Sequence, residues 1–305
     1  MSRKIGMRAL PALLAMLLVS AGVVLAVSAQ CNETSDNQLN IQSPYFKSTD
    51  KVVDSMMIPI DAEKYNKPMS KEEFYQANEE YIKFLSEQFG EEVAAKMVEN
   101  AYAKMTEYSL NSGAMNVGHI EQILNEDVYI WPYVSRDTTM SDDDGPINLI
   151  FFNIRRSPLM NSFITTGQWQ RAMGWGECGL RGDSLASLQW VGSDGVDAPN
   201  GGQLENGSYF TTRHHLVLFD GCYDSDIGYW CYGNCHYEEF RLPSGIALPY
   251  HGLYDNSMTL GRDHVLEFAR NYRNLNDWTW VNLSNGAGWE QYHDGWGIVL
   301  HMPTP

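Results

Sequence analysis

The longest apolar stretch of the chain lies close to its N-terminus. No side chain is charged in residues 9–32, and the basic residues Arg3, Lys4 and Arg8 stand in front of this stretch. It contains a small-x-small triplet at 27–29, which suits a signal peptidase. Basic residues followed by an apolar run and small residues are the pattern of an export signal. We therefore expect the rest of the chain to leave the cytoplasm.

Residues 1–29 are expected to form either a cleaved signal peptide or a membrane anchor. Cleavage after Ala29 would secrete the rest of the chain, but the apolar run also approaches the roughly 20 residues that a bilayer-spanning helix needs. Lipidation of Cys31 is disfavoured, because Gln30 is not the small residue that a lipidation signal has at this position. Both fates predict an extracytoplasmic protein, secreted or anchored at the cell surface, that contacts a membrane only through this segment.

Polar and apolar positions predict helices in the next part of the chain. Residues 30–69 are polar without sustained periodicity and are expected to be a linker. Ser70 and Glu73 then form a capping box, and apolar residues recur three or four positions apart up to Gly90, as on one face of a helix. Similar spacing continues beyond Gly90. We therefore predict a helical segment over 70–127, folded as a hairpin or a bent helix.

The remaining residues, 128–305, show short strand-like runs rich in Trp, Tyr and Gly, separated by a few helical stretches. Strands interleaved with helices predict an α/β or α+β domain, in which a mixed sheet with a few packed helices follows the N-terminal helical hairpin. The helices are expected over 157–169 and 259–273, and the strands over 145–153, 211–219, 237–242, 278–283 and 297–302.

Charge and composition narrow the classes of partner. The formal net charge is −17 at pH 7, with 38 acidic and 21 basic residues. Nucleic acids and anionic lipids bind clustered Lys and Arg, so the acidic balance argues against both as partners. The hydrophobic content of 44% is sufficient for a substantial core. After the leader, the chain is long enough for one large or two small domains.

Export changes how the cysteines are interpreted. Outside the cytosol, the four cysteines of the folded part are most simply two disulfides, whose pairing the sequence does not specify. A zinc site is the alternative, because the spacing of Cys222, Cys231, Cys235 and His236 is similar to that of zinc ligands. Reduced thiols are a third state. The cysteines predicted to form disulfides are Cys178, Cys222, Cys231 and Cys235.

Acidic loops and glycosylation sequons add weaker signals. The acidic residues at 142–144 and at Asp220, Asp224 and Asp226 are rich in oxygen, as Ca²⁺ sites are, but they do not follow the EF-hand pattern. Solvated turns are favoured and no cofactor is expected, with Ca²⁺ and Zn²⁺ as the alternatives. The sequons that could accept glycans in an exported protein begin at Asn32, Asn206 and Asn282.

Short motifs in the second half of the chain resemble those of a known family. A strand of the type Asp-Pro-hydrophobic-Asn-Leu corresponds to 144–149, and a Gly-Trp after the next helix corresponds to 174–175. A strand with Arg-His-His-Leu corresponds to 213–216, and a histidine before the Arg-Asp that opens the last helix corresponds to His251 and 262–263. These motifs are similar to those of the LssY C-terminal domain.

The resemblance to the LssY C-terminal domain covers about residues 142–275. The chain departs from the family pattern by the insertion of Gly145, by the cysteine-rich segment 222–235 and by its N-terminal helices. Members of the family accompany membrane proteins, some of them phosphatase-like, so the resemblance implies a fold and a location at the cell envelope. It implies no established activity.

The Arg-His-His run contains the best candidate site. Adjacent side chains of a strand face opposite sides, so Arg213 and His215 share one face and His214 has the other. A cluster of His, Arg and carboxylate could hold a phosphate or carboxylate group, with histidine for proton transfer. A buried structural network is the other interpretation. The predicted binding residues are Arg213, His214, His215, His251, Arg262 and Asp263.

Motifs of common enzyme classes are missing from the sequence, among them Gly-x-Ser-x-Gly, the P-loop, His-Glu-x-x-His and the dinucleotide fingerprint. We therefore predict a non-catalytic domain of the cell envelope that binds a ligand or a partner protein. The alternative is a phosphoester hydrolase whose catalytic residues are His215, His251 and Arg213. A structural component of the cell surface is a third class.

Overall fold

The structure is a computed structural model that describes most of the chain from residue 40 onward. The predictions on the leader, Cys31, the sequon of Asn32 and Asp142 fall outside the described residues. Among the described residues, no helix combines the length and the apolar character needed to cross a membrane. The described ranges are 40–65, 69–111, 117–123, 126–135, 143–193, 202–242, 250–283 and 285–303.

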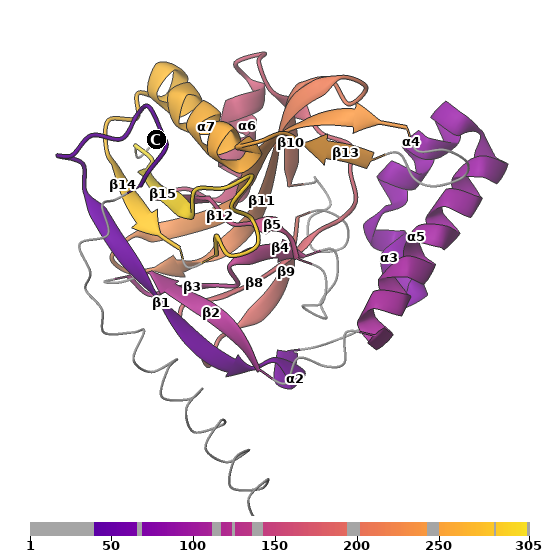
Figure 1. Ribbon diagram of the computed structural model, residues 1–305, viewed down its shortest axis with the longest axis horizontal. Coiled ribbons are helices and arrows are strands. Elements are labelled where there is room, and N and C mark those ends of the chain that lie inside the picture. The colour runs from indigo at the N-terminus through magenta and orange to yellow at the C-terminus, as the bar shows by residue number, and fades with distance from the viewer. Residues whose placement is uncertain are drawn as a thin grey trace, which may run out of the picture. The chain divides into compact units, whose positions relative to one another are not determined.

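The strands of the described ranges form one mixed sheet of 15 strands (Figure 1). Strand β1 (Val52–Asp61) links the two halves of this sheet, because it pairs in parallel with β14 (Trp278–Asn282) and antiparallel with β2 (Val117–Ile123). The first half continues from β14 through β15 (Trp296–His301), β6 (Leu149–Phe152), β12 (Gly228–Arg241), β11 (Thr212–Asp224) and β10 (Gln203–Gly207) to β7 (Gln170–Arg171), and β13 (Tyr250–Leu253) also pairs with β12.

The second half of the sheet contains shorter strands. Besides the pair of β1 and β14, only β15 and β6 run parallel among the described strands, and the other pairs are antiparallel. This mixed sheet with packed helices confirms the expected α+β fold class. From β2 the order is β3 (Val128–Ile130), β8 (Cys178–Gly182), β4 (Tyr133–Ser135) and β5 (Asp143–Pro146), with β9 (Gln189–Gly192) paired to β8.

Side chains from the two halves of the sheet share one hydrophobic core. Val217 and Phe219 of β11 and Tyr232 of β12 belong to the same buried cluster as Ile130 of β3 and Val134 of β4. Because side chains alternate along a strand, every second residue of β11 and β12 faces this core. We call this side of the first half of the sheet its inner face.

The opposite face of the first half is covered by the helices α6 (Arg156–Ile164) and α7 (Ser257–Arg273) (Figure 1). Leu216 and Cys235, which alternate with the inner-face residues, pack there with Leu266 of α7. Gly261 permits the close approach, because a Cβ at this position would lie 2.2 Å from the carbonyl oxygen of Cys235. The glycine is therefore required by packing between α7 and β12.

The N-terminal helices are α3 (Lys71–Ala77), α4 (Glu79–Phe89) and α5 (Glu91–Asn111), and α4 and α5 contact each other as the expected hairpin. The capping box of Ser70 and Glu73 is confirmed, with both hydrogen bonds formed at the start of α3. Gly90 connects α4 to α5 at a φ of 83°, a value that favours glycine. The buried face of these helices packs with Tyr209 and Trp175.

Two of the expected segment boundaries are wrong. Part of the expected linker 30–69 is β1, followed by the short helix α2 (Ala62–Tyr65), and the end of the expected helical segment 70–127 is β2. Residues 52–61 alternate poorly because the apolar residues Met56 and Met57 are adjacent, and both are exposed in the structure. The strand is held by pairing with segments far away in the chain. Non-local pairing of this kind leaves little trace in local periodicity.

Candidate functional site

Polar side chains replace apolar ones toward one end of the inner face. In the register of β11 and β12, His215 lies opposite His236 and Arg213 lies opposite Glu238. On the other side of β11, Glu205 of β10 lies opposite His215. Because residues two apart share a face, these side chains continue the row that begins with the buried core residues of β11. The strand register therefore assembles the cluster.

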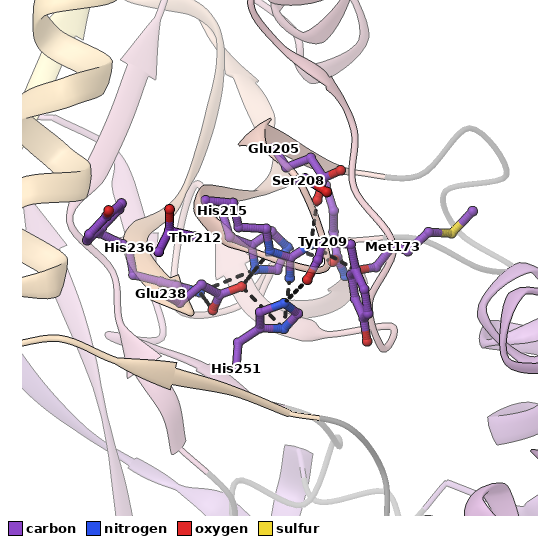
Figure 2. A network of polar contacts seen from close by, with 12 residues as sticks. Met173, Glu205, Ser208, Tyr209, Thr212, His215, His236, Glu238 and His251 are labelled. Atoms are coloured by element: carbon purple, nitrogen blue, oxygen red, sulfur yellow. Dashed lines mark hydrogen bonds and ion pairs between the residues drawn. The ribbon is translucent and has the colours of Figure 1, made fainter. Parts of the chain in front are cut away.

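His215, His236 and Glu238 form the centre of the cluster (Figure 2). Nε2 of His236 lies 2.7 Å from Oε2 of Glu238 and 3.2 Å from Nδ1 of His215, and Nδ1 of His215 lies 3.7 Å from Oε1 of Glu238. One potential metal-ligand atom from each of the three side chains lies within 4.8 Å of the others. All three residues are buried.

Arg213 joins two buried carboxylates. Its Nε donates to Oε1 of Glu238 at 2.6 Å, and its Nη1 donates to Oε2 of Glu205 at 2.7 Å and to the carbonyl oxygen of Met173 at 3.2 Å. Burial by itself would raise the pKa of Glu238, but the charges of His236 and Arg213 and the His236 hydrogen bond hold this pKa well below its usual value. Glu238 is therefore an ionised, negatively charged acceptor.

Gln203 determines which nitrogen of His215 carries hydrogen. The amide nitrogen of Gln203 donates to the carbonyl oxygen of Trp175 at 2.5 Å, which leaves its oxygen to accept from Nε2 of His215 at 2.9 Å. The lone pair of Nδ1 then faces His236 and Glu238. Burial, followed by the charge of Arg213, lowers the pKa of His215 well below 6.5. His215 is therefore neutral, which is the state in which imidazole binds metal ions.

His236 has one nitrogen in the cluster and one outside it. Its Nε2 faces His215 and Glu238, whereas its Nδ1 is buried without a hydrogen-bond partner among the described residues. The inward nitrogen is thus the only one of the two that the surrounding protein uses. The inward nitrogen is the one that a ligand held between the three side chains would meet.

His251 of β13 lies beside these three residues (Figure 2). Its Nδ1 is 3.5 Å from Oε1 of Glu238 and 3.4 Å from Nη2 of Arg213, and its Nε2 is 2.9 Å from the carbonyl oxygen of Tyr209. Burial lowers the pKa of His251, with opposing effects from the charges of Glu238 and Arg213. The structure therefore brings three of the predicted residues, Arg213, His215 and His251, into one cluster.

The other predicted residues lie elsewhere. His214 points to the helix-covered face, where its ring stacks on that of His264 with centroids 3.9 Å apart, and burial lowers its pKa to about 3. Arg262 of α7 donates to Asp263, to Asp294 and to the carbonyl oxygen of Trp296. The expectation that Arg262 and Asp263 join the cluster is therefore wrong, because their buried network belongs to α7 and the loop before β15.

Sequence reasoning missed Glu205, Gln203 and Glu238, and considered His236 only as a partner of cysteines. One signal was available on β12, since His236 and Glu238 are two residues apart and therefore share a face, as Arg213 and His215 do. The pairing of residues between β11 and β12 could not be predicted, because the register depends on the fold. Gln203 and Glu205 had no signal of their own.

The expected disulfides are not formed in this structure, in which none of the four cysteines of the described ranges is in a disulfide. Cys231 and Cys235 face the helix-covered core from one strand, with a separation of roughly 13 Å expected from the strand rise. Disulfides need Cα atoms within about 7 Å, so these two cannot pair with each other. His236 faces away from both cysteines, so the zinc set of Cys222, Cys231, Cys235 and His236 does not assemble.

The acidic loop of Asp224 and Asp226 lines a hollow of about 170 Å³ together with Gln122, Glu126 and Asp127. Asp224 accepts hydrogen bonds from the main-chain nitrogens of Asp226 and Ile227, which is the arrangement of a turn. Asp220 is separate from this loop and pairs with Arg156. The predicted solvated turn accounts for these contacts. The sequon residues Asn206 and Asn282 lie on β10 and β14, and nothing in the structure tests their glycosylation.

Comparisons with known proteins add no relative. No family model matches the chain, no curated protein matches it, and no solved structure matches it. The resemblance to the LssY C-terminal domain therefore stays a prediction. The function has to be argued from the cluster itself.

Proposed function

We propose that the protein is a non-catalytic, extracytoplasmic domain that binds one divalent transition-metal ion between His215, His236 and Glu238. The observation that supports this function is the convergence of one ligand atom from each of these side chains. The sequence offered a zinc site only as an alternative, with a set of ligands that shares His236 alone with this one. The export signal, the location at the cell envelope and the absence of catalysis are parts of the same proposal.

The distances within the group suit a metal ion. Ligand atoms bound at about 2.1 Å to one tetrahedral ion lie about 3.4 Å from each other. Nε2 of His236 lies 2.7 Å from Oε2 of Glu238 and 3.2 Å from Nδ1 of His215. Small adjustments of these side chains are sufficient to admit an ion. Binding therefore costs little conformational entropy.

The donor set indicates the class of ion. Imidazole nitrogens suit Zn²⁺ and its transition-metal neighbours, whereas Ca²⁺ and Mg²⁺ prefer sites made of oxygen. The hydrogen bond from His215 to Gln203 is of the kind that orients histidine ligands in metal sites. Two imidazoles and one carboxylate therefore favour Zn²⁺ or a similar ion.

The phosphoester hydrolase is less well supported by the contacts of Arg213. Its guanidinium already donates to two carboxylates and a main-chain carbonyl, and only 2% of the residue is exposed. A phosphate would have to displace Glu238 or Glu205 to use the same donors, leaving a buried carboxylate unpaired, which is costly. This argument favours binding of a cation over binding of an anion.

The test is metal analysis and zinc titration of the full-length chain, purified with a tag that contains no histidine. We expect one zinc per chain, lost in Glu238→Gln and retained in Glu239→Gln. Glu239 is a matched control, because it is the next residue on the same strand and its side chain is partly exposed and pairs with Arg241. Zinc bound by thiols would contribute equally to both variants. Equal zinc contents in Glu238→Gln and Glu239→Gln would therefore contradict the proposal.

A second assay separates the proposal from its main alternative. The same preparation is given a panel of phosphoesters, with and without added zinc. Under the proposal the wild-type chain releases no phosphate. Hydrolysis that disappears in His215→Ala would favour the hydrolase instead.

A further inference from the structure

We infer that His251 is the fourth ligand of the ion, so that the chain itself closes a tetrahedral site of three imidazoles and one carboxylate. This inference rests on the proposed metal site and names the group that completes it. A fourth protein ligand would also make the site structural and not catalytic. Structural metal sites are closed by four protein ligands, whereas catalytic ones keep a position for water or substrate.

The hydrogen bond of His251 to the main chain orients its lone pair toward the site. Nε2 lies 2.9 Å from the carbonyl oxygen of Tyr209, and a carbonyl oxygen can only accept. Nε2 therefore carries the hydrogen and Nδ1 carries the lone pair. His215 is arranged in the same way, with its outer nitrogen donating to Gln203 and its Nδ1 facing inward.

The aromatic neighbours of His251 hold the plane of its ring. The ring of Tyr209 meets it edge to face with centroids 4.6 Å apart, and that of Phe240 lies at 5.7 Å. Tyr209 is itself held by a buried hydrogen bond of 2.7 Å between its hydroxyl group and that of Tyr81 on α4. A histidine that is held in this way loses little conformational freedom when it binds an ion.

The inward nitrogen of His251 is close to the site and weakly engaged. It lies 3.5 Å from Oε1 of Glu238, the second oxygen of the carboxylate whose Oε2 faces His236. The group that faces it is Nη2 of Arg213 at 3.4 Å, which is long for a hydrogen bond. Coordination would exchange this weak contact for a metal–nitrogen bond once the imidazole turns toward Oε2 of Glu238.

The closed site fits the rest of the cluster. Oε1 of Glu238 is engaged by Arg213, so Oε2 is the oxygen available for an ion, and a single oxygen leaves room for a fourth ligand. Tyr209 connects His251 to α4, so the ion would also tie β13 to the N-terminal helices. The ion would then act as a structural centre between β13 and the N-terminal helices.

The experiment is a Co²⁺ titration of the full-length chain followed by visible absorption. Four-coordinate Co²⁺ absorbs strongly, whereas ions with more ligands absorb weakly. We expect the strong spectrum in the wild-type chain. In His251→Ala we expect a weaker spectrum and an affinity at least tenfold lower. Added imidazole should restore the spectrum of His251→Ala. The control is His119→Ala, since His119 is an exposed histidine on β2.

The outcomes separate the two proposals. An unchanged spectrum and affinity in His251→Ala would overturn the role of His251 and leave the metal site intact. Absence of Co²⁺ and Zn²⁺ binding in the wild-type chain would overturn the proposed function itself. If His251→Ala does not fold, X-ray absorption of the zinc-loaded wild-type chain decides the matter. Three imidazoles per zinc are expected, and two would refute the inference.

Discussion

Nδ1 of His215 and Nε2 of His236 lie 3.2 Å apart across the paired strands β11 and β12. Because Nε2 of His215 donates to Gln203, only the nitrogen of His236 can supply a hydrogen between the two rings. The same nitrogen is also 2.7 Å from the carboxylate of Glu238. Nδ1 of His215 and the carboxylate of Glu238 are thus two acceptors that face one position. Either a hydrogen on His236 or a metal ion can occupy this position.

Arg213 is expected to be essential for stability. In Arg213→Met the buried carboxylates of Glu238 and Glu205 lose their main cation, and an uncompensated buried charge costs about 3–5 kcal/mol. Urea unfolding followed by Trp fluorescence measures the difference. The matched change Arg241→Met removes an exposed pair with Glu239 and should cost at most about 1 kcal/mol. Equal losses in the two variants would show that the buried network adds no stability.

Gln203 is expected to act through His215. In Gln203→Leu the acceptor for Nε2 of His215 is lost, so His215 is no longer held with its lone pair toward the site. Loss of such an orienting group lowers metal affinity by about 10- to 100-fold, and competition with a zinc chelator measures this change. Gln168→Leu, on the exposed surface after α6, is the control. An unchanged zinc affinity in Gln203→Leu would remove the orienting role.

His293 is expected to make the fold sensitive to acid. Burial lowers its pKa from 6.5 to about 3, so the folded chain keeps it neutral while the unfolded chain protonates it below about pH 6.5. The free energy of unfolding should therefore fall as the pH drops from 6.5 toward 3, by about 2 kcal/mol at pH 5 from this group alone. His293→Phe should remove this part of the dependence.

Urea titrations of the wild type and of His293→Phe at pH 7.5 and pH 5 give the comparison. The exposed His119 supplies the control variant, His119→Phe, which should keep the wild-type slope. If the wild type and His293→Phe lost the same free energy between the two pH values, the buried imidazole would not be the cause.

The core cysteines are expected to be protected thiols. Burial raises the pKa of Cys231 and of Cys235 well above 9, and both lie within the hydrophobic core. A thiol-specific reagent should therefore leave them unmodified in the folded chain and label them after unfolding without a reductant. Peptide mapping by mass spectrometry identifies the labelled residues. Labelling of either residue only after reduction would restore the predicted disulfides.

Local patterning was sufficient for the elements with strong periodicity. The capping box of Ser70 predicted the start of α3, and the amphipathic run from residue 259 predicted most of α7. The expected strands 278–283 and 297–302 correspond to β14 and β15 within one or two residues. β1 was missed because its partners, β14 and β2, are distant in sequence and because the adjacent exposed residues Met56 and Met57 interrupt its alternation.

The candidate site was predicted in part, for a reason that lies in strand geometry. Alternation alone placed Arg213 and His215 on one face and His214 on the other. It could not show that Glu238 lies opposite Arg213, because register depends on the turn and the core that both strands share. Arg262 and Asp263 were grouped with the site by a motif, yet they serve a different buried network.

By itself, the sequence determined the acidic balance, the main helices and strands, and the face of β11 on which each residue lies. It also predicted an export signal. These properties depend on composition or on the periods of helix and strand, which neighbouring residues express. Only the tertiary structure decided that four segments, β10, β11, β12 and β13, bring Gln203, Glu205, Arg213, His215, His236, Glu238 and His251 together. Their convergence is set by hydrogen-bonded register between strands, and no local pattern encodes it.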